Sequence, residues 1–241
     1  MLSASRAVTL FRTMVSDPAS RSDQRYRDRR DAGRTLAELL REYAGRDDVV
    51  VLALPRGGVP VGYEVAKALD APFDVFTVRK LGVPGNPELA MGAIATGGVI
   101  VLDQRLIQLL GVDRSQLQQL VAAELQELER REQAYRGNRD PPEVTGKTVI
   151  LVDDGLATGS TMRAAAVAVR ELNPARIVVA VPVAAEETCD AFRDVVDEIV
   201  CGVTPRPFHA VGLWYDEFDQ TSDEEVRELL ARGSGHSEPP Q

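Results

Sequence analysis

Short stretches in which nearly every residue is apolar alternate along this chain with stretches in which apolar residues recur every three or four positions. A strand buried on both faces of a sheet has a continuous apolar run, whereas a surface helix has the longer spacing. Helical spacing occurs over 31–43, 59–69, 162–172 and 186–196. Strands are expected at 49–54, 73–78, 99–102, 149–152, 177–183 and 198–203. This alternation predicts an α/β fold with a mainly parallel central sheet and helices on both faces.

The segment 105–139 departs from this alternation because it is polar and strongly helical. Ser115 and Gln118 match a capping box at a helix start, and the apolar residues form one stripe. The stripe consists of Leu117, Leu120, Val121, Leu125 and Leu128. We interpret 105–139 as a helical insertion that packs as a surface helix pair. A lid and an oligomer contact are the alternatives.

The expected organisation has three parts. An N-terminal arm and helix occupy 1–48, the main domain occupies 49–218, and a C-terminal helix with a disordered tail occupies 219–241. The expected N-terminal arm includes a polar stretch over 16–30 that carries both charge signs. The tail is expected to be disordered because Gly, Ser and Pro follow one another there without periodicity.

Composition excludes several classes of protein. The 241 residues carry a formal net charge of −9, which argues against binding nucleic acid through a positive surface. No apolar run approaches the roughly 20 residues of a membrane helix, and Arg6 and Arg12 interrupt the apolar stretch near the N-terminus, so no signal peptide is expected. Cys189 and Cys201 have no paired spacing, so neither a disulfide nor a zinc site is expected. A reducing cytoplasm is the simplest setting.

The strongest chemical signal follows the strand at 149–152. Asp153 and Asp154 stand at the carboxyl end of an expected parallel strand, where side chains project into the ligand crevice. Two adjacent carboxylates there can accept hydrogen bonds from a sugar diol and can hold Mg²⁺, directly or through water.

The turn after the acid pair is typical of an anion site. Gly155 lets the backbone bend tightly, and backbone N–H groups at the start of the next helix can form a nest for a phosphate group. The phosphate is expected to contact Ala157, Thr158, Gly159, Ser160 and Thr161. A diol, a metal and a terminal phosphate at this spacing indicate a ribose 5-phosphate. An ordinary capped turn is the alternative.

The stretch 149–161 resembles the signature of type I phosphoribosyltransferases, which bind phosphoribosyl pyrophosphate (PRPP): an apolar strand, two acids, and a loop ending Thr-Gly-x-Thr. Two rival phosphate loops do not fit, because the loop has no Gly-Lys-Ser/Thr ending and no G-x-G-x-x-G follows a strand. The resemblance covers roughly 49–218. It is strongest to the unassigned "predicted phosphoribosyltransferases", which share the runs Leu-Pro-Arg-Gly-Gly and Arg-Lys-Leu-Gly-x-Pro-Gly-Asn-Pro-Glu-Leu-Ala.

The resemblance implies contacts to the pyrophosphate of PRPP. In the family, the loop at the place of Arg56, Gly57 and Gly58 binds pyrophosphate and often carries a cis peptide. Arg79 and Lys80 match the family's basic pair that faces the same group. A glycine turn and a solvated charge pair are the alternatives.

The family's flexible loop corresponds to 81–98, a segment rich in Gly and Pro. That loop closes over the substrates and excludes water from the reacting ribosyl group. Glu88 is the only acid in this segment and is a candidate proton donor to the base. A structural contact is its alternative role.

The segment 204–218 resembles the hood over the base in hypoxanthine-type members. His209 falls at the aromatic position, Trp214 offers a face to a planar base, and Asp216 falls at the position of a metal-linked acid. An aromatic patch that packs the C-terminal segment is the alternative. Ala157 and the run over 79–82 resemble the adenine type instead, so the acceptor stays open.

The resemblance thus implies an enzyme that binds PRPP with Mg²⁺ and transfers the phosphoribosyl group to a nitrogenous base, a purine being favoured, with release of pyrophosphate. Asp153 and Asp154 would orient the ribose and stabilise positive charge at the reacting carbon. A PRPP-binding regulatory protein without transferase activity is the main alternative, followed by a phosphoribosyl hydrolase or phosphorylase. The expected partners are PRPP and a base, with neither membrane nor nucleic acid, and a homo-oligomer is left open.

Overall fold

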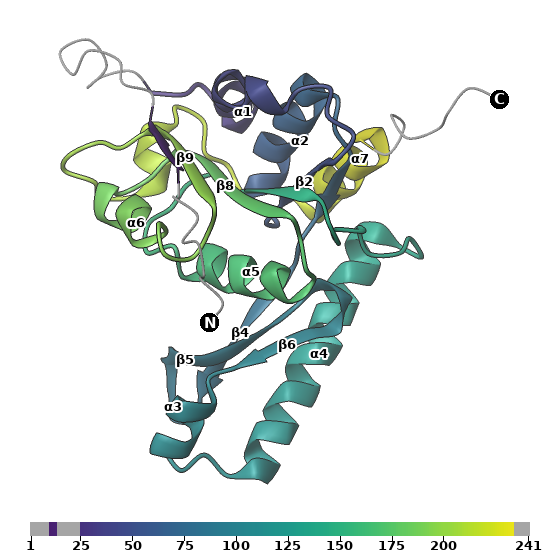
Figure 1. Ribbon diagram of the computed structural model, residues 1–241, viewed down its shortest axis with the longest axis vertical. Coiled ribbons are helices and arrows are strands. Elements are labelled where there is room, and N and C mark those ends of the chain that lie inside the picture. The colour runs from purple at the N-terminus through teal and green to yellow at the C-terminus, as the bar shows by residue number, and fades with distance from the viewer. Residues whose placement is uncertain (1–9, 14–24, 234–241) are drawn as a thin grey trace, which may run out of the picture.

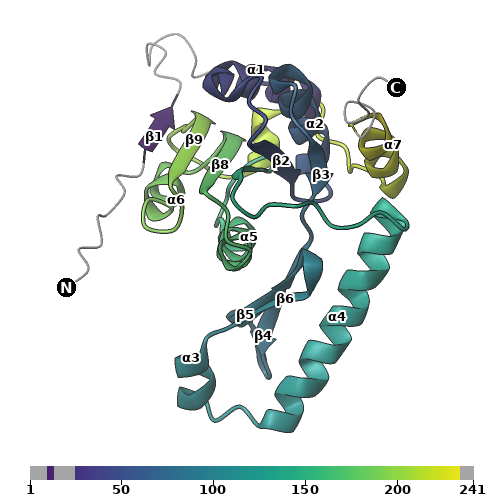
Figure 2. The ribbon, with the colours of Figure 1, turned by 45° about the vertical axis from the view of Figure 1, so that its right-hand side comes forward.

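The computed structural model describes residues 10–13 and 25–233 (Figures 1 and 2). Its centre is a sheet of six parallel strands in the order β1-β9-β8-β7-β2-β3. The strands are β1 (Leu10–Thr13), β2 (Val49–Ala53), β3 (Phe73–Val75), β7 (Thr148–Val152), β8 (Arg176–Val183) and β9 (Glu198–Val203). The expected α/β fold is therefore confirmed, although the sequence pattern does not predict β1.

Helices cover both faces of this sheet, because alternate residues of each strand point to opposite sides. Val49, Val51 and Ala53 of β2 belong to the core formed with α1 (Arg29–Leu39), α2 (Gly58–Leu69) and α7 (Asp223–Gly233). Val50 and Leu52 belong to the core on the other face, with α5 (Ser160–Glu171) and α6 (Glu186–Ala191). A short 3-10 helix, η1 (Arg41–Tyr43), follows α1. Burial on both faces explains the continuous apolar runs.

A second, antiparallel sheet projects from this core together with two helices (Figures 1 and 2). It consists of β4 (Val78–Val83), β5 (Asn86–Ala95) and β6 (Val99–Leu102), with the 3-10 helix η2 (Thr96–Gly98) between the last two strands. The helices α3 (Gln104–Leu109) and α4 (Arg114–Arg136) follow. We call residues 78–136 the arm, as distinct from the N-terminal arm expected within 1–48. The apolar stripe of α4 packs against the sheet around Leu81, Met91 and Ile94.

The arm corrects several sequence-based expectations. Residues 81–98 contribute to two strands rather than to an irregular loop, and 99–102 joins the antiparallel sheet rather than the parallel one. The strand expected over 73–78 is split between β3 and β4. The cap of α4 is Asp113, whose carboxylate accepts the backbone N–H of Ser115 at 2.8 Å and of Gln116 at 3.2 Å, so the expected capping box from Ser115 to Gln118 is wrong.

Arg136 fixes the last turn of α4 to the parallel sheet. Its buried guanidinium donates to the carboxylate of Asp74 at 2.9 Å, to Glu132 at 3.0 Å and to the carbonyl oxygen of Val75 at 2.5 Å. Burying a charge is costly unless it is paired and hydrogen-bonded, and these contacts meet that need. The end of the arm nearest the core is thus held in one position beside β3.

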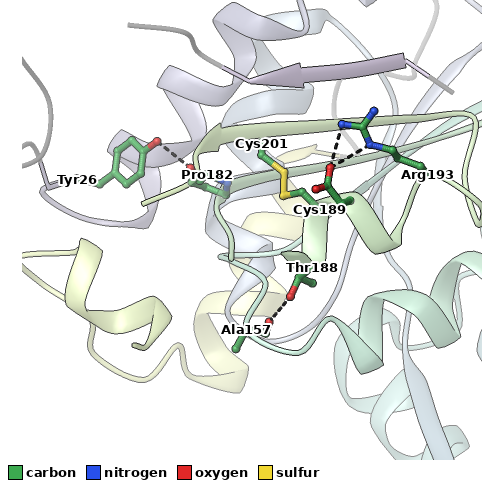
Figure 3. The surroundings of a disulfide bond; sticks show 8 residues. Tyr26, Ala157, Pro182, Thr188, Cys189, Arg193 and Cys201 are labelled. Atoms are coloured by element: carbon green, nitrogen blue, oxygen red, sulfur yellow. Dashed lines mark hydrogen bonds and ion pairs between the residues drawn. A yellow bond between two sulfur atoms is a disulfide. The ribbon is translucent and has the colours of Figure 1, made fainter. Parts of the chain in front are cut away.

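Cys189 of α6 and Cys201 of β9 form a disulfide (Figure 3). Both residues are buried. The expectation that the chain has no disulfide is therefore wrong. The twelve-residue separation gives no signal by itself, and the turn between α6 and β9 brings the two side chains together.

Two expectations lie outside the described residues, namely the polar stretch as far as it covers 16–24 and the tail over 234–241. The expected C-terminal helix corresponds to α7. Tyr26 is buried, so the described end of the polar stretch packs on the domain. No helix within residues 25–233 combines the length and the apolar character that crossing a bilayer requires.

Candidate active site

Asp153 and Asp154 directly follow the central strand β7, and the loop after the neighbouring strand β2 lies directly against them. The Pro55–Arg56 peptide bond in that loop is cis, as the resemblance implied. A Cβ atom added to Gly57 would lie 2.1 Å from a carboxylate oxygen of Asp154. A Cβ atom on Gly58 would lie 2.7 Å from the carbonyl oxygen of Val152. The two glycines therefore permit a backbone approach that no other residue would allow.

Two further residues hold Asp154 in place. The Nε of Arg29 donates to its carboxylate at 2.9 Å, and both side chains are mostly buried. The hydroxyl of Tyr215 donates to its backbone carbonyl at 2.6 Å. Arg29 and Tyr215 were not singled out from the sequence, since both contacts join segments that are far apart in the chain. The density of aromatic residues over 204–218 signals Tyr215, whereas no sequence feature signals Arg29.

The acid pair is electrostatically poised for a positive ligand group. Burial raises the pKa of Asp153 well above its usual range, and the neighbouring charge of Asp154 raises it further. Burial also raises the pKa of Asp154, and the guanidinium of Arg29 opposes that shift. An arriving cation would favour the ionised form of both carboxylates.

The N-terminus of α5 offers donors to an anion. α1, α3 and α4 each begin with an aspartate whose carboxylate accepts a backbone N–H. α5 begins instead at Gly159, which has a left-handed φ of 68° and provides no side-chain cap. Thr158, Ser160 and Thr161 are exposed beside this turn, where Thr158 Oγ1 accepts the Ser160 N–H at 3.5 Å and donates to Ser160 Oγ at 3.4 Å. Since no side chain of the described residues caps α5 in the manner of those aspartates, this turn could offer backbone donors to an anion.

Helix α6 contacts the loop that leads into α5 (Figure 3). The hydroxyl of Thr188 donates to the carbonyl oxygen of Ala157 at 2.7 Å. A Cβ atom on Gly159 would lie 2.7 Å from the ring of Phe192 and 2.8 Å from Thr188. The shape of the loop thus depends on both the glycine and α6.

The donors available for a metal are the two carboxylates of the acid pair. Within the described part of the chain, no group of three or more His, Cys, Asp or Glu could hold a metal ion. Asp216 is therefore not gathered with Asp153 and Asp154, and its backbone N–H donates to the carbonyl of Tyr26 at 2.9 Å. Mg²⁺ is usually bound by one or two carboxylates together with substrate phosphates, so the acid pair fits a metal that arrives with a phosphorylated ligand.

The predicted basic residues are engaged elsewhere. Arg79 forms ion pairs with Glu124 and Glu127 of α4. Arg56 lies 3.4 Å from the carboxylate of Asp223 at the start of α7. Lys80 follows Arg79 in β4 and, by the alternation of a strand, lies on the opposite face. Among the described residues, Arg29 supplies the ion pair to the acid pair.

The segment predicted as a hood over the base lies against the acid loop. It contains the 3-10 helix η3 (Val211–Trp214), and a Cβ atom on Gly155 would lie 2.6 Å from Val211. Trp214 packs against the cluster of Tyr26 and Tyr215, which is the alternative role considered for it.

Phe218, at the end of the hood, contacts both Tyr215 and Arg29. The centroid of its ring lies 5.0 Å from that of Tyr215, and the guanidinium of Arg29 stacks on the Phe218 ring at 3.9 Å. His209 is exposed. Glu88 belongs to β5, but its side chain lies outside the described part of the structure.

Comparisons with known proteins agree with this geometry. The family model of the phosphoribosyl transferase domain matches residues 24–203. A "Putative phosphoribosyl transferase" of Mycobacterium tuberculosis, found in strains H37Rv and CDC 1551, is 47% identical over 205 residues, which cover 85% of this chain and 46% of the relative. The chain thus spans about half the length of the curated relatives it matches. The crystal structure of TT1426 from Thermus thermophilus is 43% identical with a TM-score of 0.79, and the match covers 86% of this chain and 98% of that one.

Proposed function

Because this chain belongs to the phosphoribosyl transferase domain family, we propose that it transfers the 5-phosphoribosyl group of PRPP to a nitrogenous base, in particular a purine, and releases pyrophosphate. One observation supports the proposal most strongly. The acid pair, the glycine loop and the uncapped start of α5 lie together at the carboxyl edge of the sheet, with Gly57 against Asp154. Binding sites for a ribose, a pyrophosphate and a 5′-phosphate would then be contiguous.

Each part has a role in the proposed reaction. Backbone N–H groups at the start of α5, with Thr158 and Thr161, bind the 5′-phosphate. Asp153 and Asp154 accept hydrogen bonds from the ribose hydroxyls and stabilise positive charge as it develops at C1′. Arg29 and Tyr215 position Asp154. The glycine loop exposes backbone N–H groups to the leaving pyrophosphate, and positioning of both reactants supplies much of the rate enhancement.

Mg²⁺ fits this arrangement as the partner of PRPP. Asp153 and Asp154 would hold it, and it would neutralise charge on the leaving pyrophosphate. The raised pKa of both carboxylates reflects a site that disfavours two bare negative charges. A divalent cation removes that penalty.

The hood supports a purine as acceptor. Tyr215 bonds the hood to the carbonyl oxygen of Asp154, the neighbouring ring of Phe218 is part-exposed, and a planar base packs well on an aromatic face. Excluding water there would protect the reacting ribosyl group from hydrolysis.

A PRPP-binding regulatory protein is the second candidate. It is favoured by the engagement of Arg56 with Asp223 and of Arg79 with Glu124 and Glu127, which leaves fewer cations free to neutralise a leaving group.

A turnover screen separates these functions. The protein is incubated with PRPP, Mg²⁺ and a panel of purines, pyrimidines and other nitrogen acceptors, and pyrophosphate release is measured. Release that depends on a purine supports the transferase. PRPP binding without release under any condition supports the regulator, and release without a base supports a hydrolase.

A further inference from the structure

A polar cavity of about 250 Å³ lies between α4, the Pro55–Arg56 loop and the first residue of α7. It shares the Pro55–Arg56 loop with the candidate active site, but its other lining side chains come from α4 and α7. Arg56, Arg130 and Arg131 face it together with Tyr135 and Asp223. α4 runs beside α7 at this point (Figure 2).

Helix geometry explains why α4 presents so many polar groups to one space. Arg130 and Arg131 are followed one turn later by Ala134 and Tyr135, so these four residues share one face of the helix. The anchor at Arg136 holds that face toward the parallel sheet. The backbone around the cavity is therefore fixed, whereas its arginine side chains reach it from the surface, with 66% of Arg130, 41% of Arg131 and 35% of Arg56 exposed.

The charges around the cavity do not balance. Glu127 accepts hydrogen bonds from Arg130 at 2.7 and 3.1 Å and from Arg131 at 2.8 Å, and it lies 3.8 Å from Arg79 as well. Asp223 lies 3.4 Å from both the guanidinium of Arg56 and the hydroxyl of Tyr135. Among the described residues, these two carboxylates serve all three guanidinium groups that line the space. The chain as a whole has the opposite balance, with a net charge of −9.

Guanidinium groups suit one class of ligand in particular. Their planar arrays of N–H donors match the oxygen atoms of phosphoryl groups, and paired N–H···O contacts give both affinity and orientation. Asp223 occupies the place of such a ligand, since it touches Arg56 and Tyr135 with a single carboxylate.

We propose that this cavity is a binding site for a phosphoryl oxyanion, with Arg56, Arg130 and Arg131 as its ligands and Asp223 as the group that the anion displaces. The inference goes beyond the proposed transferase activity, because the anion is a free phosphate or pyrophosphate that binds alongside PRPP and not the pyrophosphate part of PRPP.

Calorimetric titration of the full chain with inorganic phosphate and with pyrophosphate, without Mg²⁺ and at low ionic strength, tests the proposal. Replacing both Arg130 and Arg131 with Gln is expected to weaken pyrophosphate binding at least tenfold. The matched control replaces Arg105 and Arg114, which are exposed on the arm away from the cavity, with Gln as well. It should leave the affinity for pyrophosphate within about twofold of wild type. Asp223→Asn should strengthen binding severalfold because it removes the competing carboxylate.

Three results would overturn the site: no binding to wild type, equal binding by wild type and the Arg130→Gln/Arg131→Gln variant, or an equal loss in the control. Should the double variant fail to fold, unchanged or weaker binding by Asp223→Asn is the contrary result. In a repeat with saturating PRPP and Mg²⁺, the cavity should still bind the anion; loss of binding there would also overturn the proposal, because the anion would then occupy the place of the pyrophosphate of PRPP. A failure of the proposed transferase would show separately, in the turnover screen.

Discussion

The guanidinium of Arg29 and the carboxylate of Asp154 form an ion pair at 2.9 Å across 125 residues of sequence. The same guanidinium stacks on the ring of Phe218 and donates to the carbonyl oxygen of Asp219 at 2.6 Å. Arg29 therefore joins the start of α1 to the acid loop and to the end of the hood.

Replacing Arg29 with Met should move the pH dependence of Mg·PRPP binding. Arg29 lowers the pKa of Asp154 against the effect of burial, so its removal leaves that pKa higher. Binding that needs the ionised carboxylate is then lost at a higher pH than in wild type. Calorimetric titrations from acidic to neutral pH measure the shift. Arg29→Lys keeps the charge and should fall in between, and coincident curves for wild type and Arg29→Met would contradict the proposed positioning role.

Asp153→Asn should raise thermal stability and weaken PRPP binding. Burial and Asp154 raise the pKa of Asp153, so near neutral pH its charged form opposes folding. An amide removes that charge, and each kcal/mol relieved raises the melting temperature by about 2–4 °C in a domain of this size. PRPP affinity in the presence of Mg²⁺ should fall by more than tenfold. The wild type should itself become more stable without metal as the pH falls toward the raised pKa, and a lower melting temperature for the variant would contradict this account.

Gly57→Ala tests the close approach of the two loops. Its φ of −59° suits any residue, so the effect is steric: the new Cβ would meet a carboxylate oxygen of Asp154 at 2.1 Å. We expect PRPP affinity to fall at least tenfold. Gly45→Ala is the control, since its Cβ enters open space, although its φ of 67° is strained. Comparable losses in the two variants would mean that instability, and not the site, is responsible.

Tyr215→Phe should affect the base more than PRPP. The change removes the hydrogen bond to the carbonyl of Asp154, which is worth about 1 kcal/mol, while the ring still packs in the hood. The hood would then be held less firmly over the acid loop. Steady-state kinetics should show a KM for the base raised about fivefold and a smaller rise in the KM for PRPP, because Arg29 still holds the carboxylate of Asp154. Equal effects on both constants would argue that the hood does not contact the base.

The parallel sheet could be predicted because its strands are buried on both faces. β7, β8 and β9 leave continuous apolar runs that no surface helix would show. The loop proposed to bind phosphate can be picked out as a candidate from the sequence because its small residues and paired acids are contiguous. The antiparallel sheet of the arm could not be predicted, because glycines and prolines within 82–92 mask the alternation of β4 and β5.

Contacts between distant segments could not be predicted at all. The partner of Asp154 is Arg29, and that of Arg56 is Asp223, 167 residues further along the chain. Ion pairs of this kind depend on where α1 and α7 pack, which the spacing of residues does not encode. The same holds for Arg79, whose pairing with α4 follows from an antiparallel sheet that the pattern did not reveal.

The disulfide between Cys189 and Cys201 makes the handling of the purified protein part of any binding measurement. α6 is only six residues long, and it carries both Cys189 and Thr188, whose hydroxyl bonds to Ala157 in the phosphate loop. A reducing agent in the buffer would leave that short helix without its covalent link to β9, held by packing and by hydrogen bonds such as those of Thr188 with Ala157 and Arg163 with Ala191. Two laboratories using the same chain, one with dithiothreitol and one without, would then measure different affinities for PRPP, and the difference would reflect their buffers.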